Sequence, residues 1–334
     1  MKPYLFSLIA AAAVSGFASA QTTAYTTPVG YYDFDAKLGG NIFVPGLIKS
    51  PVFAGAITAA TDNTSPTPDT LTVAANAIAA NAFNQLPAIP ADIPNGNPAV
   101  PARATHYVEI TQAGANQGIV VDIVSNTSSV ITLARDISAL GLAGTETILV
   151  RPHVTLSSCF ASAEGTLAAY SDNATFANPD GSSETYYFIG SGVWSSNFGF
   201  DDGSTRPIPP GTGIFFFTAA DVALTITGEV NTKDVVVQVT GGGVVNVVGP
   251  VNPLVGGSDL IKNLGFADMV AFTDNITIYP PGDLETSIAT YYALGDGEVS
   301  TDFTNPSTDT YSYTKGCVFV ANEDGAFKVK SGLP

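Results

Sequence analysis

The chain has 334 residues, of which 12 are lysine or arginine and 29 are aspartate or glutamate, so its formal net charge is −17. That charge repels nucleic-acid phosphates and anionic lipid, which argues against both as partners. Only 12% of the residues are charged while 45% are hydrophobic, and this balance excludes an acidic disordered chain. Because strand-forming residues accompany 33 glycines and 22 prolines, the composition predicts an all-β fold with many turns.

Residues 1–20 have the features of a secretory signal peptide. Lys2 precedes an apolar segment at 5–17, and Ala18-Ser19-Ala20 forms a small-residue cleavage site. The apolar segment is too short to remain as a membrane span. We therefore expect cleavage before Gln21 and a secreted protein, extracellular or periplasmic, without a membrane span.

The next region, residues 21–156, is predicted to form an N-terminal β module that resembles a barrel or a sandwich. Five prolines within 86–103 predict an exposed, semi-rigid loop. Helices are predicted at 74–85 and at 135–140. Four strand-like segments are spaced as in a small barrel or sandwich, at 106–111, 119–125, 130–134 and 147–151.

The rest of the chain contains an internal repeat, which predicts two related β units at 157–230 and 231–334. A repeat of this length is a supersecondary unit or a half-domain. The segment 235–248 connects the copies and consists almost purely of strand formers, so it is either buried between them or a docking edge for another subunit. The matching sequences are Asp172-Asn173 with Asp274-Asn275, Tyr186-Tyr187 with Tyr291-Tyr292, and Gly213-Ile214-Phe215-Phe216 with Gly316-Cys317-Val318-Phe319.

Several short motifs between Pro28 and about Leu260 occur in an order that resembles an uncharacterised family of secreted, β-rich bacterial proteins of verrucomicrobial type. The resemblance implies export and a β-rich fold, and it implies no activity. The loop 86–103 is an insertion relative to that pattern. The motifs are Pro28-Val29-Gly30-Tyr31, Val44-Pro45-Gly46-Leu47, Pro51-Val52-Phe53-Ala54-Gly55, Tyr107-Val108-Glu109-Ile110, Asp122-Ile123-Val124-Ser125-Asn126-Thr127, Arg151-Pro152-His153-Val154-Thr155-Leu156, Gly211-Thr212-Gly213 and Leu224-Thr225-Ile226-Thr227-Gly228-Glu229-Val230.

The chain has two cysteines, Cys159 and Cys317. An even number of cysteines in an exported protein predicts a disulfide between them. The alternative is a pair of buried free thiols, because Cys317 aligns with the core-type Ile214 in the repeat.

No catalytic residues are predicted. His106 and His153 are the only histidines, and the nucleophile motif G-x-S-x-G is absent. Two histidines without a neighbouring cysteine also argue against a zinc site.

Acidic residues gather in glycine-containing turns. Hard oxygen ligands in such turns suit Ca²⁺, but the spacing of an EF-hand loop is missing, and solvated turns are the simpler interpretation. A hydrolase that uses two of these carboxylates stays open as an alternative. The Ca²⁺ candidates are Asp201, Asp202, Asp296, Glu298 and Asp324.

Aromatic residues are dense in the first copy, where Tyr186, Trp194 and Phe198 are candidates for stacking on sugar rings. If they are buried, they are the core of that copy instead.

The sequence therefore favours a non-enzymatic structural or interaction protein of the cell exterior, which assembles with itself or with other envelope components. The first alternative is an extracellular module that binds polysaccharide, and the second is a secreted hydrolase.

Overall fold

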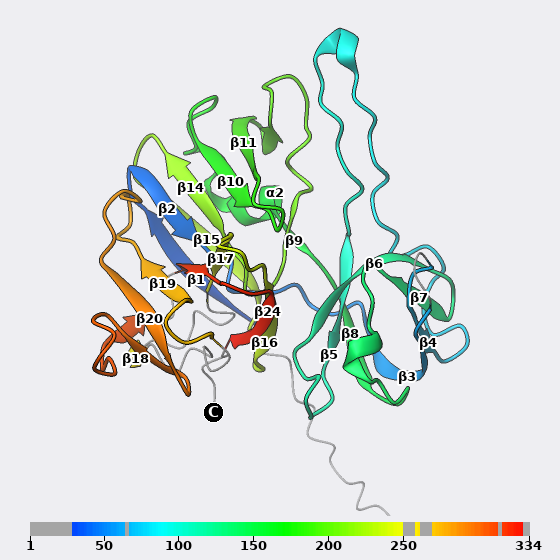
Figure 1. The fold of residues 1–334 in the computed structure, drawn as a ribbon. Helices are drawn as coiled ribbons and strands as arrows, with labels where there is room; N and C mark the ends of the chain where they lie inside the picture. The colour runs from blue at the N-terminus through cyan, green and yellow to red at the C-terminus, as the bar shows by residue number, and fades with distance from the viewer. Residues whose placement is uncertain (1–28, 64–66, 250–257, 261–268, 313–315, 330–334) are drawn as a thin grey trace, which may run out of the picture.

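The computed structural model describes residues 29–63, 67–249, 258–260, 269–312 and 316–329, and the regular secondary structure of these residues is almost entirely β-strand (Figure 1). The all-β fold class is therefore confirmed. The predicted signal peptide and its cleavage before Gln21 lie outside the described residues. In the described part of the chain, no helix is both long enough and apolar enough to cross a membrane.

Six strands close into a barrel, which confirms the predicted barrel in this part of the chain. Alternate residues of two of these strands point inward, so Ile123 and Ile131 are fully buried in the barrel core. The strands, in order around the barrel, are β3 (Phe53–Thr61), β4 (Thr70–Val73), β7 (Val130–Leu133), β6 (Val120–Asn126), β5 (His106–Ile110) and β8 (Thr147–Pro152).

The two helices predicted in this region do not form as expected. Residues 74–85 fold into turns, in which Asn81 has a left-handed backbone (φ 61°) and its N–H donates to the carbonyl of Asn126 on β6 at 3.0 Å. Hydrogen bonds to the barrel thus replace those of a helix, and tertiary contact overrides the local preference of alanine. At 135–140 only the short 3₁₀-helix η2 (Ser138–Leu140) is present.

A second module, unit one, consists of a five-stranded sheet and a two-stranded ribbon (Figure 1). Its strands β1 and β2 come from the segment that was predicted to belong to the N-terminal module, so the barrel is inserted between β2 and the rest of unit one. The sheet has the order β12 (Val193–Ser195), β11 (Ser183–Gly190), β10 (Asn173–Ala177), β14 (Ile214–Thr218), β2 (Gly39–Phe43), and the ribbon pairs β1 (Val29–Ala36) with β15 (Val222–Glu229).

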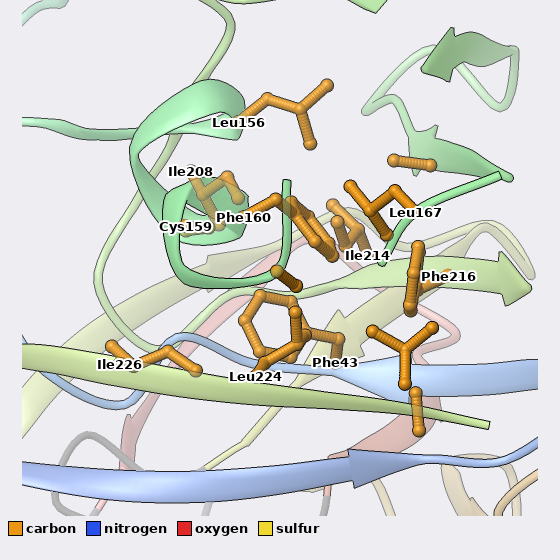
Figure 2. Close-up of a cluster of buried hydrophobic side chains, with 14 of the residues drawn as sticks. Phe43, Leu156, Cys159, Phe160, Leu167, Ile208, Ile214, Phe216, Leu224 and Ile226 are labelled. Atoms are coloured by element: carbon orange, nitrogen blue, oxygen red, sulfur yellow. The ribbon is translucent and has the colours of Figure 1, made fainter. Parts of the chain in front are cut away.

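The core of unit one is aromatic (Figure 2). Phe160, from the short helix α2 (Leu156–Phe160), lies with its ring centroid 4.7 Å from that of Phe216 and 5.0 Å from that of Trp194. Burial alternates along β15, so Leu224 points into this core while its neighbours face solvent. Each large side chain buried here stabilises the fold by roughly 1.5–3 kcal/mol.

Unit two has the same strand order as unit one. This correspondence is what the predicted repeat requires, while common descent of the two units stays a prediction. Read from the edge that corresponds to β12, its sheet has the order β21 (Glu298–Ser300), β20 (Ala289–Gly295), β19 (Asn275–Ile278), β23 (Cys317–Val320), β17 (Val245–Val248). Its ribbon pairs β16 (Val235–Val239) with β24 (Gly325–Val329). A separate pair is formed by β18 (Ser258–Leu260) and β22 (Thr310–Ser312).

The connecting segment 235–248 is not a free docking edge. Its strand β16 pairs with β24 along its whole length, and the N–H of Val236 on its other edge donates to the carbonyl of Gly118 in the barrel at 2.9 Å. Val235 and Val237 are buried in the core of unit two. Of the two interpretations that the sequence left open, burial is therefore confirmed.

Apolar side chains and a buried charge network join the modules. Ile42 of unit one packs against Val247 and Val318 of unit two. At the barrel, the buried guanidinium of Arg151 bonds to Glu109 at 2.8 Å and to Glu229, at the end of β15, at 2.7 Å. Because both carboxylates are buried as well, this network holds the barrel and unit one in one relative position.

Candidate functional site

The structure separates the three predicted aromatic ligand residues. Trp194 is fully buried and Tyr186 is 4% exposed, because both lie on the inner face of the unit-one sheet, whereas Phe198 is 46% exposed. The prediction of sugar stacking is therefore wrong for Trp194 and Tyr186. Phe198 alone is accessible to a ligand.

The predicted Ca²⁺ residues lie in separate turns, and no three of them converge within the described residues. Two of the carboxylates accept backbone hydrogen bonds: Asp201 accepts from the N–H of Ser204 in its own turn at 3.0 Å, and Asp324 accepts from that of Gly241 in a different turn at 2.8 Å. Asp202 is buried and accepts a hydrogen bond from the N–H of Ser196 at 2.8 Å. Asp296 and Glu298 lie at the turn between β20 and β21. These contacts agree with the simpler interpretation of structural turns.

A different acidic group, which the sequence did not indicate, lies at the barrel. Ligand oxygens of Asp62, Asp69 and Asp136 lie within 4.8 Å of one another. Asp69 is buried and already accepts from the N–H groups of Asn63 at 2.8 Å and Ile137 at 2.6 Å. Its carboxylate is thus part of the loop structure.

The predicted disulfide is not formed. Cys159 and Cys317 are both free, and each is buried in a different core, that of unit one and that of unit two. The alternative interpretation, two buried free thiols, is the one that the structure supports. Burial raises the pKa of Cys317 to about 12 and also raises the pKa of Cys159, so both thiols stay protonated near neutral pH.

His153 has a structural environment. Its side chain is fully buried, its Nε2 lies 2.9 Å from Oδ1 of Asp122 on β6, and its ring packs against Tyr107 on β5. His106 is half-buried, and burial lowers its pKa. Neither imidazole lies in the arrangement that nucleophilic catalysis needs, with an orienting carboxylate on one side and an accessible nucleophile on the other.

The proline-rich arm, residues 86–103, belongs to none of the hydrophobic core clusters of the described residues. It projects from the barrel as two adjacent chain segments (Figure 1). The segments bond to each other at every third residue, in the pairs Leu86 with Arg103, Ile89 with Val100, and Asp92 with Asn97. In each pair both N–H groups donate, at 2.8–3.1 Å.

The spacing of these pairs follows from the sequence of the arm. Its triplets place proline, which lacks an N–H, directly after each of the pairing residues Leu86, Ile89, Asn97 and Val100. Proline also favours the polyproline II helix, whose three residues per turn return every third residue to the same side. The prolines predicted an exposed, semi-rigid loop, and the repeated X-Pro-Ala triplet is the sequence signal that also indicates this pairing.

The arm is fixed to unit one at both ends. At its base, buried Arg103 donates to the carbonyl of Asp202 and, at 2.8 Å, to the hydroxyl of Tyr186. At its tip, the side chain of Asn197 donates to the carbonyl of Gly96 at 3.0 Å. Tyr186, a predicted sugar ligand, thus acts as an anchor for the arm.

Two clusters of exposed aromatic side chains lie at corresponding places in the two units. In unit one, the ring of Phe198 is 4.6 Å from that of Tyr187 and 5.9 Å from that of Tyr170. In unit two, Phe303 stacks on Tyr292 at 4.1 Å. We call these groups the unit-one and unit-two aromatic clusters, and the second also includes Phe272 at the position that corresponds to Tyr170.

Both clusters are held in a conformation that costs energy. Tyr170, Phe198, Phe272 and Phe303 all have left-handed backbones, with φ between 62° and 66°, and all four are 45–61% exposed. A non-glycine residue in this region costs of order 1 kcal/mol or more and persists only where surrounding contacts impose it. Near Phe303, hydrogen bonds from Asn305, Ser300 and Thr304 hold the pKa of Asp302 well below its usual range and fix the loop.

The comparisons with known proteins add no function. The chain matches no protein-family model, no curated protein and no solved structure. The resemblance to secreted verrucomicrobial proteins accordingly stays a prediction.

Proposed function

We propose that this chain is an exported, non-enzymatic interaction protein that assembles with itself by placing its proline-rich arm on exposed aromatic side chains of a neighbouring copy. The observation that carries the proposal is the arm itself. Residues 86–103 are ordered by six reciprocal hydrogen bonds, yet most of their side chains face solvent. Ordering a segment costs about 1–2 kcal/mol per residue in backbone entropy, and little burial within this chain offsets that cost.

The chemistry of the arm identifies its partner surface. Polyproline II segments bind aromatic-lined surfaces, because the helix is already extended and loses little entropy on binding. The chain offers two such surfaces, the unit-one and unit-two aromatic clusters. A second copy of the chain therefore carries both halves of the contact.

The unit-two cluster is the better acceptor. The unit-one cluster lies beside the loop in which Asn197 already holds the tip of its own arm. Within the described residues, the arm makes no hydrogen bond to unit two, where Phe272, Tyr292 and Phe303 occupy the corresponding positions. An arm from one copy on unit two of the next would generate a head-to-tail assembly.

Charge supports the same assignment. A net charge of −17 opposes the close approach of identical chains. Residues 86–103 carry one acid, Asp92, and one base, Arg103, so the arm is neutral overall and can approach an acidic neighbour without net repulsion. Screening by salt should therefore strengthen assembly.

The test removes the arm and keeps its base. Leu86 and Arg103 form a reciprocal pair, which a two-residue Asn-Gly turn can close, so residues 87–102 are replaced by Asn-Gly. Sedimentation velocity across a NaCl series should show salt-strengthened oligomers for the parent chain and monomers for the arm-deleted chain.

Matched substitutions then identify the acceptor. Phe303→Ser should weaken self-association roughly tenfold, as expected when an interface aromatic is removed, while Phe198→Ser should change it little. A parent chain that stays monomeric at every salt concentration, or an arm-deleted chain that associates as well as the parent, would reject the proposal.

A second function is favoured by the same exposed aromatics. Rings that are fixed and exposed on two units suit stacking on two sugar residues of one polysaccharide. Binding on a glycan array that is lost in Phe272→Ala and is unaffected by arm deletion would support polysaccharide binding in place of assembly.

A further inference from the structure

An open cavity lies where the barrel, unit one and unit two meet. Its volume is about 390 Å³, which is within the size range of small-molecule sites. Strand β6 of the barrel, β10 of unit one and both β16 and β17 of unit two contribute to its wall. Junctions between modules are a preferred location for ligand pockets.

The wall is mainly apolar, with a few polar groups. Val120, Val236 and Pro209 each belong to a different module and contribute apolar surface. Arg135 and Arg206 contribute positive charge, and Asp122 contributes a negative one. An apolar wall with a small number of polar groups is the composition expected of a site for a small organic molecule.

Most of these polar groups are already engaged. Arg206 bonds to Glu184 at 2.9 Å and to Asn178 at 3.0 Å, and its guanidinium lies 4.8 Å above the ring of Phe176. Asp122 bonds to His153. These groups shape the cavity wall and have little capacity left for a ligand.

Arg135 is the one arginine whose guanidinium has neither a hydrogen bond nor an ion pair among the described residues, and its Nε is buried. The Nε of Arg103 is also buried without a partner, but its other nitrogens donate to Asp202 and Tyr186. Burial lowers the pKa of Arg135, which the charge of Asp122 only partly offsets. A partly buried guanidinium without an ion pair or hydrogen bond is stabilised by an anion, so this part of the cavity wall favours an anionic group.

We propose that this cavity binds a small organic monocarboxylate, with the carboxylate on the guanidinium of Arg135 and the apolar body against the valine and proline wall. A guanidinium binds a carboxylate through two parallel hydrogen bonds, which provides both energy and orientation. Asp122 belongs to the same wall, so a dianion such as phosphate would meet more repulsion than a monoanion.

The probes are sodium benzoate and benzamide, which share their shape and differ in charge, with phosphate as the dianion. Calorimetric or NMR titration at constant ionic strength should give benzoate a dissociation constant of about 1 mM, and benzamide and phosphate at least tenfold weaker binding. Equal binding of benzamide would mean that the carboxylate is not recognised, and equal binding of phosphate would mean that any anion is accepted. Either result would overturn the proposal.

Four variants complete the test. Arg135→Gln should weaken benzoate binding at least tenfold, and Arg135→Lys should retain part of it. Lys37→Gln removes one exposed positive charge elsewhere and should leave binding unchanged. Arg135→Met, which removes the unpaired charge, should melt at the same or a higher temperature than the parent chain and still fail to bind benzoate. A folded Arg135→Met or Arg135→Gln chain that binds benzoate like the parent would refute the assignment.

Discussion

Asp172 of unit one and Asp274 of unit two make the same two hydrogen bonds in different sheets. Asp172 accepts from the N–H groups of Ala168 and Ala219, both at 2.8 Å. Asp274 accepts from those of Val270 and Asn322, both at 2.7 Å. Each carboxylate is nearly fully buried. Asp172 joins the turn before β10 to the turn after β14, and Asp274 joins the turn before β19 to the turn after β23.

This relationship predicts equal sensitivity to substitution at the two positions. Asp172→Ala and Asp274→Ala each leave two buried N–H groups unpaired and should lower the free energy of unfolding by about 2–4 kcal/mol. Urea denaturation measures the loss. Asp201→Ala, at an exposed turn with one such bond, is the control and should cost less than about 1 kcal/mol. A large loss at only one of the two buried positions would count against equivalent roles.

The buried network at Arg151 makes a separate prediction. Arg151→Ala leaves Glu109 and Glu229 buried without a cation and should destabilise the protein by about 3–5 kcal/mol. Lys37→Ala breaks the exposed pair with Asp221 and should cost far less than Arg151→Ala, because solvent screens that pair. Thermal melting of the two variants compares them, and a similar small loss for both would show that the Arg151 network is not important for stability.

The burial of both cysteines predicts thiols that react only when the protein is unfolded. The native protein should not react with a thiol reagent at pH 8, because both side chains are buried and protonated. Unfolding in denaturant without a reducing agent should release two reactive thiols per chain. A melting temperature that falls on reduction would instead indicate a disulfide.

The same thiols predict that stability falls at alkaline pH. Burial raises the pKa of Cys317 from 9.0 to about 12 and raises that of Cys159 in the same direction. Above pH 9 the unfolded chain therefore loses protons that the folded chain keeps, and each thiol lowers the free energy of unfolding by about 1.4 kcal/mol per pH unit. Below pH 9 the two states bind equal numbers of thiol protons and the effect vanishes.

Urea midpoints at pH 8, 9.5 and 10.5 test this slope. The double variant Cys159→Ala, Cys317→Ala starts from a lower stability but should show a shallower decline, since only the tyrosines and lysines remain to titrate. Identical slopes in the variant and the parent chain would contradict the assignment.

Local patterns were sufficient to predict much of the fold. The spacing of strand-like segments at 106–151 predicted the barrel, because each of its strands pairs with partners within the same region of the chain. In β15, buried Val222, Leu224 and Ile226 alternate with exposed residues, and this alternation of branched aliphatic side chains with alanine and threonine is visible in the sequence. The repeated sequences predicted two related units; their sheets have corresponding strand orders, while the duplication itself stays a prediction.

Long-range pairing was not predictable in this way. Strand β1 pairs with β15 and β2 with β14, across the whole inserted barrel, and no local pattern encodes a partner so distant. The burial of Trp194 and Tyr186 depends on that pairing, because these strands complete the core that covers them. The arm and the cavity at Arg135 depend in turn on how the modules pack, so neither could be predicted as a site from the sequence.

The inserted barrel also has a consequence for the order of folding. Phe53 at its first strand pairs with Val150 at its last, so a folded barrel holds the two ends of the insertion side by side. For unit one, the inserted segment of about a hundred residues then behaves as a short loop, so the entropic cost of bringing β2 and β14 together is smaller.

A chain exported from its N-terminus would complete the barrel before β14 and β15 emerge. Pulsed hydrogen exchange during refolding should show protection of β5 and β8 before β1, and a barrel substitution such as Ile131→Ala should slow the closure of unit one, although it touches none of its strands.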